Sequence, residues 1–127
     1  SNPVLPNKKA DTLTGLPTDE TFLSTEVITN ARCKEMANQL VLDSLSQAMQ
    51  LASTDTKRLL TASQFFQSSC FSVSQLKQLC NYFKTDEGRY DFLLEAWLYV
   101  TDRTQFDKLV VVFSNQDLVQ RFKAMIQ

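Results

Sequence analysis

Residues 72–83 read SVSQLKQLCNYF and carry the clearest helix signal in the chain. Ser72 and Gln75 have the spacing of a capping box, in which each side chain accepts a hydrogen bond from the other residue's backbone N–H. After this start, apolar residues recur every three or four positions, at Val73, Leu76, Leu79, Cys80 and Phe83. The spacing predicts a helix with one buried face.

Similar signals lie on both sides of this segment. Helices are predicted to begin near Asn38, at Thr54 or Asp55, at Thr85 or Asp86, at Asp102 and near Gln116, each followed by apolar residues at helical spacing. A further helix over residues 19–30 is disfavoured by β-branched residues at positions 25 and 27–29. The pattern therefore predicts a succession of short helices from about residue 39 onward.

Proline and glycine are distributed unevenly. All three prolines and Gly15 lie in the first 17 residues, whereas residues 18–127 contain only Gly88. A strand-rich domain of that length needs more turn formers, so we predict an all-α fold. We expect residues 1–17 to be a flexible leader or linker and residues 18–127 to be a single helical domain.

Part of the sequence repeats. The tetrapeptide DTKR at 55–58 precedes DEGR at 86–89 by 31 residues. This interval predicts a helix–turn–helix unit of about 30 residues, and short turns make neighbouring helices antiparallel. The expected architecture is a compact array of antiparallel helix pairs, orthogonal or solenoid-like.

Composition excludes several classes of function. The chain has 13 basic and 14 acidic residues and no histidine. We therefore expect no nucleic-acid partner, which needs a basic face, and no histidine-based catalysis or metal site. The densest apolar run, 109–113, is far shorter than the roughly 20 residues that span a bilayer, so no membrane insertion is expected. No catalytic, cofactor-binding or metal-binding residues are predicted.

A set of spaced residues carries a family resemblance. It consists of Cys33, the 55–62 segment DTKRLLTA, Ser69-Cys70-Phe71, Gln75-Leu76, Phe83, Arg89, Tyr99, Asp102, Phe106 and Phe113. Over residues 33–127 this pattern resembles a helical family widespread in Bacteroidetes, domain of unknown function 4476. The resemblance implies a helical domain, often found on exported proteins, with no established activity and no assigned catalytic residues.

The three cysteines have different expected roles. Cys80 falls on the apolar face of its helix and is expected to be buried as a small apolar side chain. Cys33 precedes a helix, Cys70 closes a turn, and both match cysteines that recur in the family. The resemblance thus implies a Cys33–Cys70 disulfide and an oxidising compartment. The alternative is three free thiols.

Two surface features are candidates for function. Tyr82 and Tyr99 each flank a core position, so they form a possible interaction surface for a protein or a glycan. Asp91 and Glu95 lie one helical turn apart and suggest an alternative, a hydrolase-like enzyme with a carboxylate pair in a groove between helices. Solvated carboxylates balanced by nearby arginines are the simpler interpretation of that pair.

We therefore expect a non-catalytic domain of an exported bacterial protein, periplasmic or extracellular, that serves in protein interaction or structure. For an exported protein we expect that the signal peptide has been removed. A cytoplasmic location is the alternative. The partner and the oligomeric state remain open. One further possibility is an oligomerisation module that associates through an apolar face such as Val111-Val112.

Overall fold

A computed structural model describes residues 28–127 of the chain, so the predicted leader (1–17) and most of the disfavoured helix over 19–30 lie outside the described residues. The described part contains α1 (Gln39–Leu51), α2 (Asp55–Phe66), α3 (Val73–Cys80), α4 (Asp86–Ala96), the 3₁₀ helix η2 (Arg103–Val112) and α5 (Gln116–Met125). Within residues 28–127 no strand longer than an isolated β-bridge is present, so the all-α prediction is confirmed.

Side-chain caps set most helix starts. The predicted capping box is present: Ser72 Oγ accepts from Gln75 N, and Gln75 Oε1 accepts from Ser72 N. Thr54 and Thr85 cap α2 and α4 with their side chains, without the returning hydrogen bond of a capping box. Asp102 is different, because its side chain makes no cap bond to η2 and instead accepts from Val73 N at the start of α3. The prediction that Asp102 caps the helix following it is therefore wrong.

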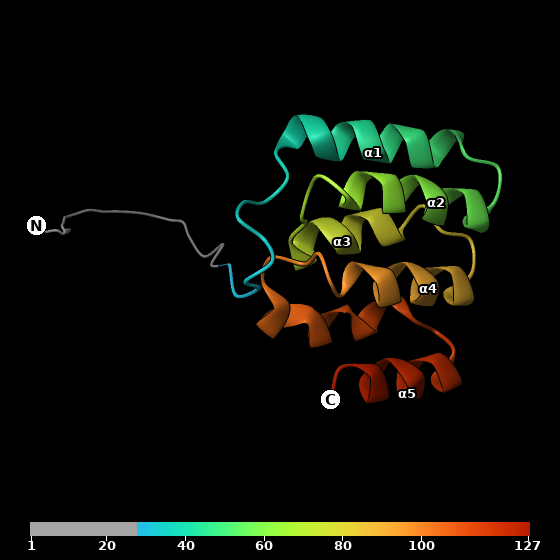
Figure 1. The fold of residues 1–127 in the computed structure, drawn as a ribbon. Helices are drawn as coiled ribbons and strands as arrows, with labels where there is room; N and C mark the ends of the chain where they lie inside the picture. Colours follow the sequence, from blue (N-terminus) through green and yellow to red (C-terminus); the bar gives the residue numbers. More distant parts are fainter. Residues whose placement is uncertain (1–27) are drawn as a thin grey trace, which may run out of the picture.

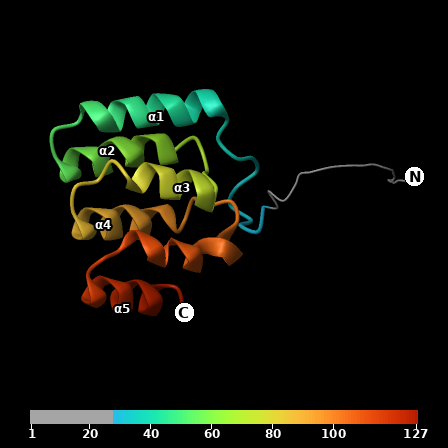
Figure 2. The same cartoon turned by 180° about the vertical axis from the view of Figure 1, so that it is seen from behind.

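The helices form three successive pairs, α1–α2, α3–α4 and η2–α5. The residues that precede the first helix of each pair, Asn38, Ser72 and Asp102, recur at intervals of 34 and 30. Figure 1 shows the elements following one another from α1 at one end to α5 at the other. In this array α2 contacts α4, α4 contacts α5, and α3 contacts η2. Figure 2 shows the same succession of elements from behind. The result is a short, solenoid-like stack of helix pairs.

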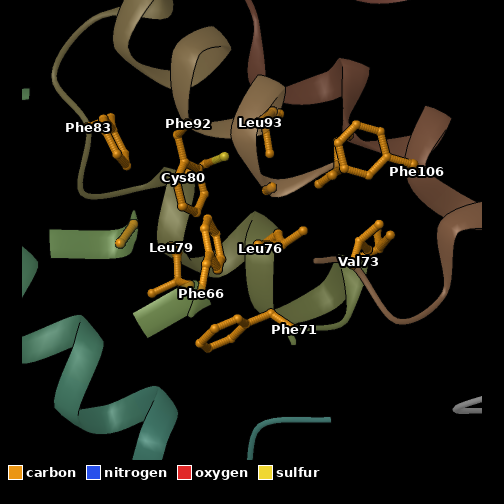
Figure 3. Packing of buried hydrophobic residues seen from close by; sticks show 14 of the residues in the cluster. Phe66, Phe71, Val73, Leu76, Leu79, Cys80, Phe83, Phe92, Leu93 and Phe106 are labelled. Carbon is orange, nitrogen blue, oxygen red and sulfur yellow. The ribbon is translucent and has the colours of Figure 1, made fainter. Parts of the chain in front are cut away.

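Aromatic rings form much of the core. Phe66, Phe71, Phe83, Phe92, Phe106 and Phe122 are all at most 2% exposed. Phe66 lies 5.6 Å from Phe71 and 5.9 Å from Phe92, so it joins rings from three parts of the chain (Figure 3). Cys80 lies among them, as predicted, and is a free thiol. Burial raises the pKa of this thiol to about 12, against the opposing influence of the Arg89 charge.

Asp55, in the repeated tetrapeptide, joins one helix pair to the next. Its carboxylate lies at the start of α2 and accepts hydrogen bonds from Lys84 N (2.9 Å), Thr85 N (3.0 Å) and Thr85 Oγ1 (2.8 Å) in the loop before α4. Both backbone N–H groups lie just before the first residue of α4, where the helix itself offers no acceptor. The carboxylate therefore fixes the position of α4 relative to α2.

Arg58, three residues later, completes this arrangement. Its Nη1 donates to Asp55 Oδ1 at 2.9 Å, and its other nitrogens donate to the carbonyls of Met49 (3.1 Å) and Ala52 (2.8 Å) at the end of α1. The arginine is only 5% exposed. We call this set of contacts, made by an Asp and the Arg three residues after it, the Asp–Arg clasp.

The second tetrapeptide forms a second Asp–Arg clasp. Asp86 accepts from the backbone N–H groups of Ser114 (2.9 Å) and Asn115 (2.6 Å) in the loop before α5. Arg89 donates to Asp86 at 2.7 Å and to the Phe83 carbonyl at 3.0 Å. The 31-residue interval in the sequence thus reflects a repeated contact between neighbouring helix pairs.

Replacing Gly88 with alanine is expected to lower the free energy of unfolding by about 1–3 kcal/mol. A Cβ at this position would overlap the Asp55 carboxylate, which its hydrogen bonds hold in place. Helix propensity alone predicts the opposite sign, because alanine is favoured over glycine by about 1 kcal/mol inside a helix. Urea denaturation measures the difference, with the exposed substitution Gln64→Ala as the control. A more stable Gly88→Ala variant would contradict the close contact.

Candidate binding groove

Residues 28–37, which we call the strap, run across one end of the helix pairs. At its start, Thr29 N donates to the Thr101 carbonyl at 2.7 Å, and at its end, Ala37 N donates to the Cys70 carbonyl at 2.7 Å. Met36 of the strap forms an isolated parallel β-bridge with Cys70. A second isolated parallel bridge, between Phe71 and Val100, joins the two turns that the strap contacts. The strap therefore contacts the turns that precede both α3 and η2.

Asn30 anchors the first half of the strap. Its side chain is 4% exposed, and its Nδ2 donates to the carbonyls of Leu98 (3.1 Å) and Val100 (3.0 Å). Its Oδ1 accepts from Arg32 N at 3.0 Å. Both N–H donors of the side-chain amide and one of the two lone pairs of its oxygen are thus used, as expected for a buried amide. Sequence reasoning missed this residue, because its partners lie about 70 positions away.

A disulfide fixes the second half of the strap. Cys33 and Cys70 are bonded, with their Cα atoms 5.9 Å apart, as the family resemblance implies. The bond joins the strap to the turn between α2 and α3. Together with Asn30, it attaches the strap at two separate points of the helical array.

A groove of about 690 Å³ lies beside the disulfide. It is bounded by the strap, the first residues of α1, the end of α2 and the turn that follows. Among its lining residues Phe66 is buried and Tyr99 is half-buried, and we call these two the floor. The charged side chains of Arg32, Lys34 and Glu35 are exposed, and we call them the rim. Polar side chains from the turn, those of Gln67, Ser68 and Ser69, complete the lining.

Tyr99 is held in a defined orientation on this floor. Its ring stacks on Phe66 with centroids 5.2 Å apart and an interplanar angle of 11°. The Arg32 guanidinium lies over the Tyr99 ring, 5.7 Å from its centroid. Phe66 and Arg32 therefore both lie against the Tyr99 ring. These contacts use part of the ring surface and leave the Tyr99 hydroxyl for a ligand.

The other predicted tyrosine lies elsewhere. Tyr82 follows α3, and its hydroxyl is 3.4 Å from Gln50 Nε2 near the end of α1. Tyr99 instead shares its groove with Asn38, the residue that caps the start of α1. The two tyrosines therefore lie at opposite ends of α1 and do not share one groove, while their role in an interaction stays a prediction.

A second groove, of about 600 Å³, lies between α3 and η2. Lys77 and Lys108 line it, together with Thr29 of the strap and Asp102, whose carboxylate accepts a hydrogen bond from the first residue of α3. Sequence reasoning did not identify this groove, because its two lysines lie 31 positions apart on helices whose contact no local pattern reveals.

The carboxylates proposed for the enzyme alternative line neither groove. Asp91 is exposed on α4. Partial desolvation and the nearby Glu87 carboxylate raise its pKa, and the Arg121 charge opposes them. Arg121 also pairs with Glu87 at 3.4 Å and lies over the Tyr90 ring. The groups that influence Asp91 are thus an ion pair on the surface of α4 and α5.

Two searches of residues 28–127 gave negative results. No cluster of three or more histidine, cysteine, aspartate or glutamate side chains is arranged to hold a metal ion in this part of the chain. Nor does any helix within these residues have the length and apolar character needed to cross a bilayer.

The fold and the groove define a class: an all-α stack of three helix pairs whose end is crossed by a disulfide-bonded strap. Residues 27–126 match the family described as a domain of unknown function (DUF4476). The chain therefore belongs to that family, and the match includes the whole strap and all six helices of the described residues. No curated protein and no solved structure matches the chain.

Proposed function

We propose that this chain is a non-catalytic interaction module that binds a segment of a partner polypeptide in the groove beside the disulfide. The observation that carries the proposal is the groove itself: a concavity of about 690 Å³ with an aromatic floor and a polar, charged rim. Ligand sites commonly combine an apolar floor with a few polar groups that orient the ligand. The strap forms one wall, and its disulfide and Asn30 hold that wall in place before any ligand arrives.

The environment of Tyr99 favours a polypeptide over a glycan. Sugar binding typically uses the open face of an aromatic ring, but Phe66 and Arg32 both lie against the Tyr99 ring and reduce its open surface. The free hydroxyl can exchange hydrogen bonds with backbone amides of a bound segment. Arg32 and Lys34 outnumber Glu35 on the rim, so a segment with a net negative charge fits best.

The disulfide supports an exported location. Disulfides persist in oxidising compartments such as the periplasm and the extracellular space, and they are rare in the cytosol. We therefore place the proposed interaction in the periplasm or outside the cell. Catalysis by Asp91 and Glu95 is the less favoured alternative, because neither carboxylate faces a described groove.

Selection of random displayed peptides on the oxidised protein tests this proposal. Tyr99→Phe keeps the stacking on Phe66 and removes only the hydroxyl, so selected peptides are expected to bind it several-fold more weakly, as for the loss of one hydrogen bond of about 1 kcal/mol. Ser68→Trp should block the groove and abolish binding. Tyr82→Phe, at the other end of α1, is the matched control and should bind like the unmodified protein.

Two results would overturn the proposal. One is peptides that bind Tyr99→Phe and Ser68→Trp as tightly as the unmodified protein, since the binding surface would then lie elsewhere. The other is a glycan array that yields ligands sensitive to Ser68→Trp while no peptide binds, which would assign the groove to carbohydrate.

A further inference from the structure

The outward face of α1 carries a stripe of four residues, Leu40, Ser44, Gln47 and Leu51, which we call the α1 stripe. At 100° per residue these positions fall within about 60° of one another around the helix axis. They lie directly opposite the residues that face the core, Leu42, Leu45 and Met49. Leu40 is 74% exposed and Leu51 is 80% exposed, the two most exposed large apolar side chains of the described residues.

Charge is almost absent from α1. Its 13 residues include no lysine or arginine, and the only carboxylate is Asp43, which accepts a hydrogen bond from Gln39 at 2.8 Å. The helix has no acidic residue in its first turn and no basic residue in its last turn. Its macrodipole therefore lacks the end charges that usually stabilise a surface helix. A second helix packed antiparallel to α1 would supply the complementary dipole.

The α1 stripe is symmetric along the helix. Leu40 and Ser44 are four residues apart, Ser44 and Gln47 are three apart, and Gln47 and Leu51 are four apart. Reversing the direction of the helix therefore leaves the pattern of apolar and polar residues unchanged. A two-fold interface requires such a surface, because each subunit contributes the same patch.

We propose that α1 pairs with α1 of a second copy of this chain, antiparallel, about a two-fold axis between Ser44 and Gln47. In this arrangement Leu40 packs on Leu51 of the second copy at both ends of the interface. Ser44 meets Gln47 of the second copy at the centre, where hydroxyl and amide exchange hydrogen bonds and fix the register. Asp43 faces an alanine, Ala48 of the second copy, so no like charges meet.

This dimer is independent of the proposed function. It uses the face of α1 opposite the core, whereas the groove beside the disulfide is lined by Val41 of α1 and by Asn38, which caps that helix. A single pair of helices, about 16 Å long between the outer leucines, gives an interface below the usual size of a stable dimer. We therefore expect reversible association with a dissociation constant on the order of 100 μM.

Sedimentation equilibrium of the full chain tests the association. The unmodified protein is expected to dimerise, and Leu40→Asp or Leu51→Asp to weaken the dimer at least about tenfold, since each places two carboxylates in the interface. Leu60→Asp is the matched control: it changes another exposed leucine, 60% exposed on α2, and should leave the dissociation constant unchanged. Circular dichroism checks that each variant is folded. A protein that stays monomeric at about 1 mM would overturn the proposal, as would a dimer sensitive only to Val111→Asp.

Cysteine cross-linking tests the orientation. In the antiparallel arrangement a mixture of Leu40→Cys and Leu51→Cys proteins should form a disulfide-linked heterodimer under mild oxidation, because Cα atoms at paired positions lie within the range that a disulfide spans. Either variant alone should cross-link several-fold more slowly. Faster cross-linking of each single variant with itself would indicate a parallel pair and overturn the proposed geometry.

Discussion

Replacing Asp55 with alanine is expected to lower the free energy of unfolding by about 2–4 kcal/mol, because its carboxylate, 16% exposed, accepts several hydrogen bonds and is the counter-charge of the more deeply buried Arg58. The substitution leaves the Lys84 and Thr85 N–H groups without their acceptor. It also leaves Arg58, which is 5% exposed, without a counter-charge. Urea denaturation monitored by circular dichroism measures the loss.

Asp43→Ala is the matched control for this prediction. Like Asp55, Asp43 is an aspartate in a helix. Unlike Asp55, it is exposed and accepts a single side-chain hydrogen bond, from Gln39. Its removal should change the free energy of unfolding by less than about 0.5 kcal/mol. Equal losses for the two variants would mean that the Asp–Arg clasp contributes no more than an ordinary surface aspartate.

The Asp–Arg clasps also predict how stability depends on pH. Burial acts to raise the pKa of Asp55, but hydrogen bonds from Lys84, Thr85 and Arg58 outweigh it and hold the pKa below its ordinary value. The pKa of Asp86 is lowered in the same way by bonds from Asn115 and Ser114. A lowered pKa in the folded state stabilises the protein above the unfolded-state pKa, and that contribution disappears as pH falls through the folded-state value. Stability should therefore fall below about pH 4, and less steeply in Asp55→Ala.

Loss of the disulfide is expected to have the other large effect. A Cys33→Ala/Cys70→Ala variant should lose about 3–4 kcal/mol of unfolding free energy, because the bond closes a loop across a separation of 37 residues and restricts the unfolded chain. Reduction of the unmodified protein should produce a similar loss. A reducing agent should not change the stability of the double variant, whose remaining thiol is buried Cys80. A loss below about 1 kcal/mol would show that the strap is held mainly by its hydrogen bonds.

Local signals were sufficient to predict the helices. The capping box at Ser72 and the apolar spacing behind it involve residues within one or two turns of each other, so the sequence contains the whole interaction. The repeat of Asp55 and Asp86 was likewise visible as a pattern. The contact that the repeat makes could not be predicted, because each carboxylate accepts hydrogen bonds from a loop about 30 residues further along the chain.

The groove depends on contacts that no local pattern contains. The Asn30 side chain donates hydrogen bonds to the carbonyls of residues 98 and 100, and the Arg32 guanidinium lies over the Tyr99 ring. The strap that these contacts position has no periodicity, so nothing in its sequence except Cys33 distinguishes it from a linker. Tyr82 and Tyr99 both flank core positions, and only the direction of the intervening helices places them at opposite ends of α1. Composition could suggest exposed tyrosines but not which one lines a concavity.

The Asp–Arg clasp has a consequence for how such a chain can change in length by gene duplication. Each clasp is directional: a carboxylate at the first position of one helix binds the loop before the next helix of the same series. An inserted copy of about 31 residues would bring both a new carboxylate and a new loop to receive one, so the array could grow without rebuilding any existing contact. In α5 the equivalent first and fourth positions are Gln116 and Val119, which cannot form the clasp. Growth by duplication is therefore expected between α2 and α4, and not beyond α5.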